Sequence, residues 1–572
     1  MATSHNSTPE HNSKPGTKPM PDGVDSSIQS AHSVGRSAAL ISFFVIISRI
    51  TGFMRTWAMA FALGSTMLAS SYQVANNLPN MLYELVMGGM LVTAFLPVYM
   101  STKQKLGDKG GNEYASNLMS LTFIVLGIVA IICTLFAPAL IFTQSFMSDQ
   151  STVSDAIFFF RFFAVQIVFY GLSSIVSGLL NASRDYLWSS AAPIFNNIIV
   201  TVTFVAYAIV APVDTELAKF IIAIGNPLGV FVQLAIQLPA LKRNGIKLRF
   251  HVNLKDPALK ETLSIGIPAV IVMLSGLVIV SIQNTAAYAA AENGPSVIAY
   301  ARLWFTLPYA FLTVPITTTL FTEISDMVAR GNESGFKRGL IGGINQIAFL
   351  MVPFGMYLIV FSIPLVTLYH IGAFTAENIT QIATYLAVLA ISLPFYAIST
   401  YLQKAFSALR QMTKYTIFTL IAAVAQISFT LIFATQAGGS LGVFGLPAVA
   451  FGETIFYAIV DTASLLYLRI TLGPLGLKST LLTSLRAIAL GVLGSLTAGA
   501  VIYVLLSGLF PMNGSLINAI AVIVIGGIVA LLVTYAPACF LKLPEAKMLT
   551  TVIDKITSKI PGSNVRHAKH AR

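Results

Sequence analysis

Two arginines six residues apart lie inside the first long apolar segment of the chain. Arg49 and Arg55 stand in the run SRITGFMR (residues 48–55), and the segment contains no acidic residue. On a helix, this spacing separates them by about 9 Å along the axis and about 120° around it. A guanidinium can bind two phosphate oxygens at once, whereas an uncompensated charge near the bilayer centre costs at least roughly 2.5–3.5 kcal/mol. The pair therefore favours an anion-binding site, with Gly52 leaving room for close approach.

Further charged residues inside apolar segments are candidates for function. Arg302 is the natural third cation, contributed by the other half of the chain, although arginines near helix ends also extend to lipid headgroups. Glu84 is either a counter-ion to Arg49 or Arg55 or a residue of the cytoplasmic vestibule. Glu453 and Asp461 lie eight residues apart on one broad helical stripe. They either couple transport to Na⁺ or H⁺, or pair with Lys404 or other polar groups.

Catalytic and metal-binding patterns are absent from the sequence. There is no phosphate-binding Walker loop, no zinc spacing and no histidine within an apolar segment. The two cysteines, Cys133 and Cys539, both lie in apolar segments, where we expect them to be small buried apolar side chains. We therefore expect a transporter rather than an enzyme, with no metal or cofactor, driven by Na⁺, H⁺ or the membrane potential.

The elements that must position these residues are membrane spans. The chain is 56% hydrophobic and 10% charged, whereas a soluble domain averages about 25% charged residues. Apolar runs long enough for a bilayer core of about 30 Å recur throughout. They predict an all-α polytopic membrane protein of about fourteen transmembrane helices. The spans, with ends uncertain by about four residues, are 37–64, 66–102, 113–142, 152–183, 187–211, 217–241, 258–291, 295–326, 338–369, 377–409, 413–436, 441–470, 479–509 and 515–542.

Charge alternates between the connecting loops. The loops after even-numbered spans carry the Lys and Arg residues, whereas those after odd-numbered spans carry acidic residues such as Asp214 and Glu292. Lys219 is the exception. Cationic loops are retained in the cytoplasm, so both termini are expected to be cytoplasmic and the number of spans even. Anionic membrane lipids then account for the net charge of +12, and no nucleic-acid partner is needed.

The two halves of the chain resemble each other at an offset of 226 residues. The segment FYGLSS (169–174), continuing to Arg184, matches FYAIST (395–400), continuing to Arg410. A block of six spans returns the chain to the same side, so the copies are parallel and form two six-helix lobes around a central cavity, with two helices appended. The predicted organisation is a disordered cytoplasmic tail (1–36), an N-lobe (37–243), a C-lobe (244–470), spans 13 and 14 (471–543) and a cytoplasmic tail (544–572). Within the last tail, 547–560 is either an amphipathic surface helix or a weakly structured segment.

Three motifs resemble those of one transporter family. The run SRITGFMR, the later Asn77-Leu78-Pro79-Asn80 and the sequence GAFT (372–375) are similar to motifs of the MurJ (MviN) lipid II flippases. These belong to the multidrug/oligosaccharidyl-lipid/polysaccharide (MOP) transporter superfamily. The resemblance covers nearly the whole chain. It implies movement of lipid II, the lipid-linked peptidoglycan precursor, from the cytoplasmic to the outer leaflet by alternating access, for cell-wall synthesis and cell shape.

Site residues follow from this resemblance. Arg49 and Arg55 correspond to cavity arginines that engage the pyrophosphate and sugar head, and Arg302 falls close to the family's eighth-span arginine, with a spacing to Pro308 that is one residue longer. Many members have an arginine where this chain has Tyr83 followed by Glu84, and an aspartate where it has Thr56. The cavity is therefore less cationic, and Asn76, Asn77 and Tyr83 are expected to share in head-group recognition.

Other functions are compatible with the same pattern. A related exporter would carry another polyprenyl-pyrophosphate-linked sugar, and a drug antiporter would favour acids over arginines in its cavity. A non-transporting scaffold that binds cell-wall synthesis proteins has little reason to bury arginines. A polyprenyl-phosphate glycosyltransferase would need acidic motifs in a large outer loop, and the outer loops are short.

Overall fold

The computed structural model describes residues 24–83, 95–147, 153–511 and 513–546, and all regular structure within those ranges is helical. Eleven helical segments of this described part are long and apolar enough to cross a membrane. The predicted first, second and seventh spans correspond to α1, α2 and α10, and the second continues into residues 84–94, outside the described ranges. The chain is therefore an all-α multi-span membrane protein, as the sequence predicts.

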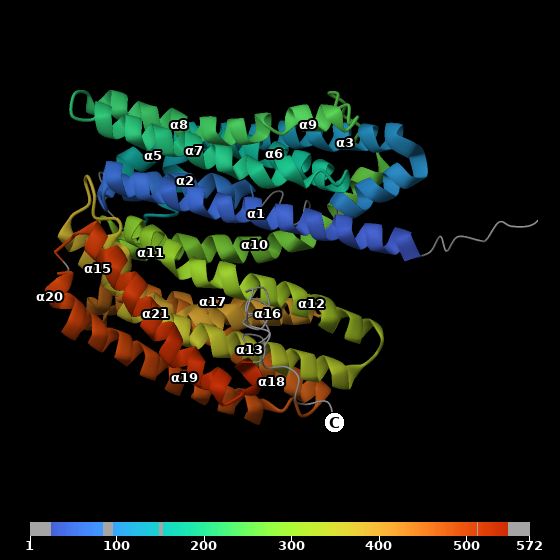
Figure 1. Ribbon diagram of the computed structural model, residues 1–572. Helices are drawn as coiled ribbons and strands as arrows, with labels where there is room; N and C mark the ends of the chain where they lie inside the picture. The colour runs from blue at the N-terminus through green and yellow to red at the C-terminus, as the bar shows by residue number, and fades with distance from the viewer. Residues whose placement is uncertain (1–23, 84–94, 148–152, 512, 547–572) are drawn as a thin grey trace, which may run out of the picture.

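The helices form two groups with two helices appended (Figure 1). The first group contains α1 (Val24–Leu63), α2 (Met67–Tyr83), α3 (Leu96–Leu135), α4 (Ala137–Phe142), α5 (Ser154–Phe163), α6 (Gln166–Ala182), α7 (Tyr186–Val210), α8 (Thr215–Ala235) and α9 (Leu238–Arg243). The second contains α10 (Pro257–Ala290), α11 (Gly294–Pro308), η4 (Tyr309–Thr313), α12 (Val314–Ala329), α13 (Glu333–Val360), α14 (Ser362–Thr367), α15 (Ala376–Leu389), η5 (Ala390–Ser392), α16 (Leu393–Ala408), α17 (Met412–Ala434), η6 (Gln436–Phe444) and α18 (Gly445–Leu472). We call these groups the N-lobe and the C-lobe.

The last helices pack on the outside of the C-lobe. They are α19 (Leu477–Ala500), η7 (Val501–Leu506), α20 (Ser507–Leu509), α21 (Leu516–Phe540) and η8 (Pro544–Ala546). Both α19 and α21 contact α13, and the Tyr357 hydroxyl of α13 donates to the Ala530 carbonyl of α21 at 3.2 Å. The predicted division into six, six and two spans therefore describes the architecture.

The structure moves the start of the first helix toward the N-terminus. Residues 24–36 were expected in a disordered tail, but α1 already begins at Val24. The four prolines of the tail all precede this point, and nothing after Pro21 prevents helix formation. The predicted amphipathic stretch at 547–560 lies outside the described residues.

Proline breaks a long helix beside the cavity. The predicted eighth span consists of α11, which ends at Pro308, the π-helical segment η4 and α12, which begins one residue before Pro315. A proline inside a helix removes one N–H donor and frees a carbonyl, which favours a local change of helix type. The eighth span is therefore an irregular helix, with a π-helical segment between its two prolines.

The 226-residue repeat is visible in the backbone. Arg184, after α6, and Arg410, after α16, both adopt left-handed conformations, with φ of 59° and 57°. The residue after each donates to a carbonyl five residues earlier: Asp185 to Leu180 at 2.9 Å, and Gln411 to Phe406 at 2.8 Å. Since non-glycine residues rarely adopt positive φ, the shared turn supports a structural repeat.

Basic side chains gather at one end of the bundle, which we call the basic end. It contains the turns α6–α7, α9–α10, α12–α13, α16–α17 and α18–α19 and lies on the right in Figure 1. Arg184, Lys247, Arg330, Arg410 and Lys478 lie there. The opposite end contains the turns α1–α2, α7–α8, α10–α11, α14–α15 and α17–α18. Lys219, near this opposite end, is neutralised locally by Asp155 at 3.1 Å and Glu216 at 3.4 Å.

Candidate substrate cavity

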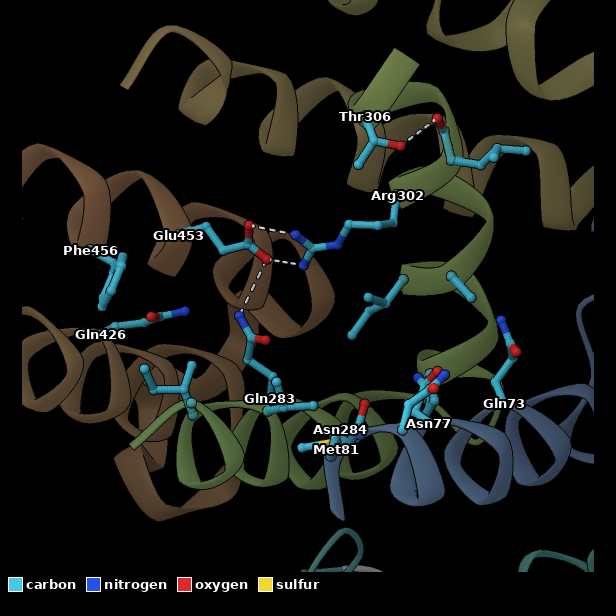
Figure 2. A pocket seen from close by; sticks show the side chains of 18 of the residues that line it. Gln73, Asn77, Met81, Gln283, Asn284, Arg302, Thr306, Gln426, Glu453 and Phe456 are labelled. Atoms are coloured by element: carbon cyan, nitrogen blue, oxygen red, sulfur yellow. Dashed lines mark hydrogen bonds and ion pairs between the residues drawn. The ribbon is translucent and has the colours of Figure 1, made fainter. Parts of the chain in front are cut away.

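A cavity of about 600 Å³ lies between the two lobes, and we call it the central chamber. Helices α1 and α2 form its N-lobe wall, while α10, α11, α17 and α18 form its C-lobe wall. Charged and amide side chains of both lobes line it: Arg55, Gln73, Asn77, Asn80, Gln283, Asn284, Arg302, Gln426 and Glu453. Figure 2 shows the side chains of α2 facing those of α11 and α18 across this space.

A second chamber adjoins the first toward the basic end. It measures about 560 Å³, is lined by α1, α7, α11 and the start of η4, and we call it the basic-end chamber. Arg55, Thr56, Leu303 and Thr306 line both chambers. A polar path therefore extends from the basic end to the middle of the protein.

The two arginines of α1 occupy different positions along this path. Arg49 is exposed and lines the basic-end chamber, whereas Arg55 is half-buried and lines both chambers. Among the described residues, no carboxylate lies within ion-pair distance of either guanidinium. Gly52 packs near the Asn197 amide of α7, which donates to the Ser48 carbonyl at 3.2 Å and to the Thr51 hydroxyl at 3.1 Å. These bonds fix this turn of α1 against α7, so both arginines are positioned by the N-lobe.

Arg302 is held by a carboxylate within its own lobe. Its guanidinium forms a two-pronged ion pair with Glu453, with one contact at 3.0 Å, and the Gln283 amide donates to the same carboxylate at 3.3 Å (Figure 2). The Glu453 side chain is 4% exposed and that of Arg302 is 36% exposed. The predicted third cation therefore reaches the chamber with its charge compensated. Pairing of Glu453 with Lys404 is wrong, because Lys404 donates to the Thr317 hydroxyl of α12 at 3.0 Å.

The equivalent position in the N-lobe has no charge. Asn76 of α2 is related to Arg302 by the 226-residue offset, and its side-chain oxygen accepts a hydrogen bond from Asn226 of α8. Asn226 is related to Gly452, the neighbour of Glu453. The predicted binding residue Asn76 thus lines a small side pocket beside Arg55, while Asn77 lines the central chamber itself.

Sequence reasoning missed several amides of the chamber. On α2, Gln73 and Asn80 join Asn77 on one face, because positions i, i+4 and i+7 lie on the same side of a helix. That spacing of amides within a span is the signal that could have found them. The amides of α10 and α17 carry no such periodic signal.

The remaining predicted site residues lie away from the central chamber. Tyr83 shares a hydrogen bond with Ser174 of α6, and its ring lies 5.9 Å from that of Tyr170. Glu84 is outside the described residues. Asp461 is buried inside the C-lobe. The binding and ion-coupling roles assigned to all these residues stay predictions.

Contacts between the lobes concentrate at the end opposite the basic end. The hydroxyls of Ser65 and Ser296 (α11) share a hydrogen bond of 2.9 Å. The Ser296 N–H donates to the Ser70 hydroxyl of α2 at 3.1 Å. The Tyr300 hydroxyl donates to the Gly64 carbonyl at 2.7 Å. Ser70 and Ser296 are separated by 226 residues, so equivalent residues of the two copies meet here.

The GAFT sequence at 372–375 belongs to this closure. The Ala373 N–H donates to the Phe61 carbonyl of α1 at 3.0 Å, and Gly372 adopts a φ of +64° with its Cα close to the same carbonyl. Phe374 packs against Tyr300, and the Thr375 side chain caps α15. A side chain at Gly372 would collide with Phe61, so glycine is required both by the backbone conformation and by the close approach.

Fold and cavity together define a multi-span membrane protein with two helical lobes around a central chamber, a fold shared with solved transporters of the MOP superfamily. A solved structure of an inward-facing MATE-family transporter of that superfamily matches with a TM-score of 0.63 at 14% identity, covering 75% of this chain and 98% of that one. A structure of the lipid II flippase MurJ in an inward closed conformation matches with a TM-score of 0.69 at 21% identity, covering 88% and 99%.

Sequence comparison identifies the family. The family model "Lipid II flippase MurJ" matches residues 59–525, and the chain belongs to this family. A probable lipid II flippase MurJ of Rhizobium meliloti is 25% identical over 371 residues, which is 64% of this chain and 69% of the relative. The lipid II flippase MurJ of Burkholderia cenocepacia is 25% identical over 365 residues, or 63% and 70%.

Proposed function

We propose that the protein flips lipid II from the cytoplasmic to the outer leaflet of the bacterial cell membrane. One observation carries the proposal: in a member of the MurJ lipid II flippase family, the cavity between the lobes contains a cation, Arg55, without an acidic partner among the described residues. A pyrophosphate must lose water to enter the membrane, and a fixed guanidinium offsets that loss through charge-assisted hydrogen bonds.

The basic end faces the cytoplasm in this proposal. Lys and Arg in short loops are retained on the cytoplasmic side, and the one basic residue that departs from the pattern, Lys219, is neutralised by Asp155 and Glu216. Both termini are then cytoplasmic. The basic-end chamber becomes the entry for the head group, and Arg49 is the first cation that it meets.

The chambers and the contacts between the lobes suggest how the cycle proceeds. The head group passes Arg49, reaches Arg55 and meets the amides of Gln73, Asn77 and Asn80, which can bind sugar hydroxyls and peptide groups. Hydrogen bonds that α11 and the GAFT segment form with the α1–α2 turn and the end of α1 close the outer end, with Tyr300 donating to Gly64 and Ala373 to Phe61. Rocking of the lobes would break these bonds and open the chamber outward. The polyprenyl tail stays in lipid, along the exposed apolar surface of α19 and α21, as the family resemblance implies.

Reconstituted protein gives the direct test. Proteoliposomes containing labelled lipid II should show protein-dependent movement of the head group between leaflets. The Arg55→Ala variant should lose that movement while keeping its thermal stability, since no described acid depends on Arg55 for its partner. Normal flipping by both Arg49→Ala and Arg55→Ala would overturn the site.

The same vesicles separate the alternative functions. A polyprenyl-pyrophosphate-linked sugar of another class, moved faster than lipid II, would identify a related exporter. Absence of movement for any such lipid, with the protein folded, would favour a scaffold for cell-wall synthesis proteins.

A further inference from the structure

An acidic side chain that the cavity does not use lies inside the C-lobe. Asp461 of α18 is 5% exposed, and neither carboxyl oxygen has a hydrogen-bond partner of normal geometry among the described residues. No Lys or Arg of the described part forms an ion pair with it. An ionised carboxylate in such surroundings lacks both water and a counter-charge, a state that buried carboxyls avoid by taking up a proton.

The described side chains of the helices packed against α18 supply no charge that compensates this carboxyl. From α17, Tyr415 is the titratable group that faces it. Helix α16 contributes the Ser399 hydroxyl, and Lys404 of that helix is engaged with Thr317 of α12. Tyr385 of α15 lies beside the Arg302–Glu453 pair. The described side chains of α10 nearest α18 are uncharged, with Gln283 donating to Glu453.

The charged groups of α18 itself are equally unable to compensate Asp461. Glu453 lies two turns away and is held by Arg302, while Arg469 lies two turns away in the other direction and is exposed. Ser464, one turn from Asp461, is fully buried and its hydroxyl has no partner among the described residues. The environment of Asp461 therefore consists of neutral hydroxyl groups.

A row of hydroxyls leads from the central chamber toward this carboxyl. Tyr457 lines the chamber and lies one helical turn from Asp461. Tyr415, on the neighbouring helix α17, has its hydroxyl 3.0 Å from that of Ser399. Ser399 lies beside Asp461. Hydroxyls both donate and accept hydrogen bonds, so the row can pass a proton without a charged side chain.

The N-lobe shows what lies beside the serine that matches Ser399 in the repeat. Ser173, related to Ser399 by the 226-residue offset, accepts a hydrogen bond from the amide of Gln237 at 2.9 Å. The Gln237 oxygen accepts from Ser177 at 2.7 Å, so this buried amide is satisfied. In the N-lobe, the side chain beside Ser173 is the neutral amide of Gln237. In the C-lobe, the side chain beside Ser399 is the carboxyl of Asp461, which is neutral only when protonated.

We infer that Asp461 is a proton-binding site, reached from the central chamber through Tyr457, Tyr415 and Ser399, and that its proton is exchanged during the transport cycle. The exchange part of this inference rests on the proposed function. When the chamber opens outward, a proton enters and binds the carboxylate to give the neutral acid. When it opens inward, the same proton leaves to the cytoplasm, so one proton moves inward as one lipid moves outward.

Infrared spectroscopy tests the bound proton without any lipid substrate. The full-length protein in lipid nanodiscs at neutral pH should show the carbonyl band of a protonated carboxylic acid. The band should vanish in Asp461→Asn and persist in Glu453→Gln, because Glu453 is already held in an ion pair by Arg302. No such band in the wild type, or a band that survives in Asp461→Asn, would overturn the site. Thermal melting of Asp461→Asn checks its folding; in the N-lobe an amide, that of Gln237, is accommodated beside Ser173.

Vesicles with an imposed proton gradient test the exchange. With the outward-facing side more acidic by about one pH unit, the steady-state ratio of lipid II between leaflets should shift by up to about tenfold, if one proton moves per lipid. Asp461→Asn should lose the shift. A shift that remains in this variant, or one produced by a sodium gradient in place of the proton gradient, would overturn proton exchange. Wild-type vesicles that do not flip lipid II would refute the proposed function and leave the infrared result standing.

Discussion

The N-lobe and the C-lobe place different chemistry at equivalent positions of the cavity wall. In the C-lobe, Arg302 and Glu453 form a charged pair, whereas in the N-lobe the amides of Asn76 and Asn226 meet. The N-lobe contributes Arg49 and Arg55 instead, and neither of these two has a carboxylate partner in the described ranges. One lobe therefore leaves positive charge unpaired beside the cavity, and the other keeps its positive charge compensated.

This difference separates binding from stability. An unpaired arginine side chain in the chamber has lost part of its hydration. It gains compensating charge-assisted hydrogen bonds only when an anion binds. Arg302 has already regained them through Glu453. We expect substitutions in the N-lobe to change transport and substitutions in the C-lobe pair to change stability first.

The largest effect is expected at Arg55. The Arg55→Ala variant should lower the flipping rate by about a hundredfold, since it removes the cation proposed to pair with the pyrophosphate, and loss of one partner of such a charge pair costs about 2–5 kcal/mol. The measurement is lipid II movement in proteoliposomes, with Arg49→Ala as the matched control. Arg49 lines only the basic-end chamber and is exposed, so its loss should have a smaller effect. Equal losses in the two variants would contradict the separate positions of these side chains.

Removal of Arg302 should destabilise the C-lobe. The Arg302→Ala variant leaves the Glu453 carboxylate, 4% exposed, without its counter-charge, a change worth about 3 kcal/mol. Thermal or denaturant unfolding in detergent would measure it. The double variant Arg302→Ala/Glu453→Gln should recover part of the loss, because no buried charge is then left unpaired. A single variant as stable as the wild type would show that the pair is not structural.

Neutralising Glu453 should make the two lobes more alike. In Glu453→Gln, the half-exposed Arg302 guanidinium lacks its counter-charge and can bind an anion in the chamber. We expect lipid II to bind about tenfold more tightly, a gain of roughly 1.4 kcal/mol, and to leave the outward-open state more slowly. Titration with a soluble lipid II analogue would show this. Unchanged affinity would mean that the cargo does not reach Arg302.

The smallest effect is expected at the amide pair of the N-lobe. The Asn226→Ala variant removes one neutral hydrogen bond to Asn76, which contributes about 0.5–1.5 kcal/mol. Its unfolding should therefore shift less than that of Arg302→Ala. A shift as large as the one at Arg302 would remove the contrast between the lobes.

The order of the helices could be predicted from the sequence because it depends on local properties. Apolar length fixes each span, and the Arg184 and Arg410 turns repeat a pattern that is visible in the residues themselves. The start of α1 was placed too late because polar composition was interpreted as disorder, although residues 24–36 contain no proline.

The cavity could be predicted only in part because its contacts are distant in sequence. Arg55, Arg302 and Asn77 do line the central chamber, but the pairing of Arg302 with Glu453 joins residues 151 positions apart. Asn76 and Asn77 look alike in the sequence, and only the packing of α2 against α8 turns one toward Asn226 and leaves the other in the chamber. Asp461 and Glu453 lie on one helical stripe, but only Glu453 has an arginine beside it. Its carboxylate is therefore paired, whereas the Asp461 carboxyl has no partner among the described residues.

The hydrogen bond between Ser296 and Ser70 joins residues related by the repeat offset. Such self-contacts are the mark of an isologous interface, in which a patch meets its own copy across a two-fold axis. In a homodimer, any substitution would appear on both sides of that axis. Because both halves here are parts of one polypeptide, each wall was able to diverge: the Arg302–Glu453 ion pair on one side and the Asn76–Asn226 amide pair on the other are an asymmetry that a symmetric assembly of identical subunits could not encode.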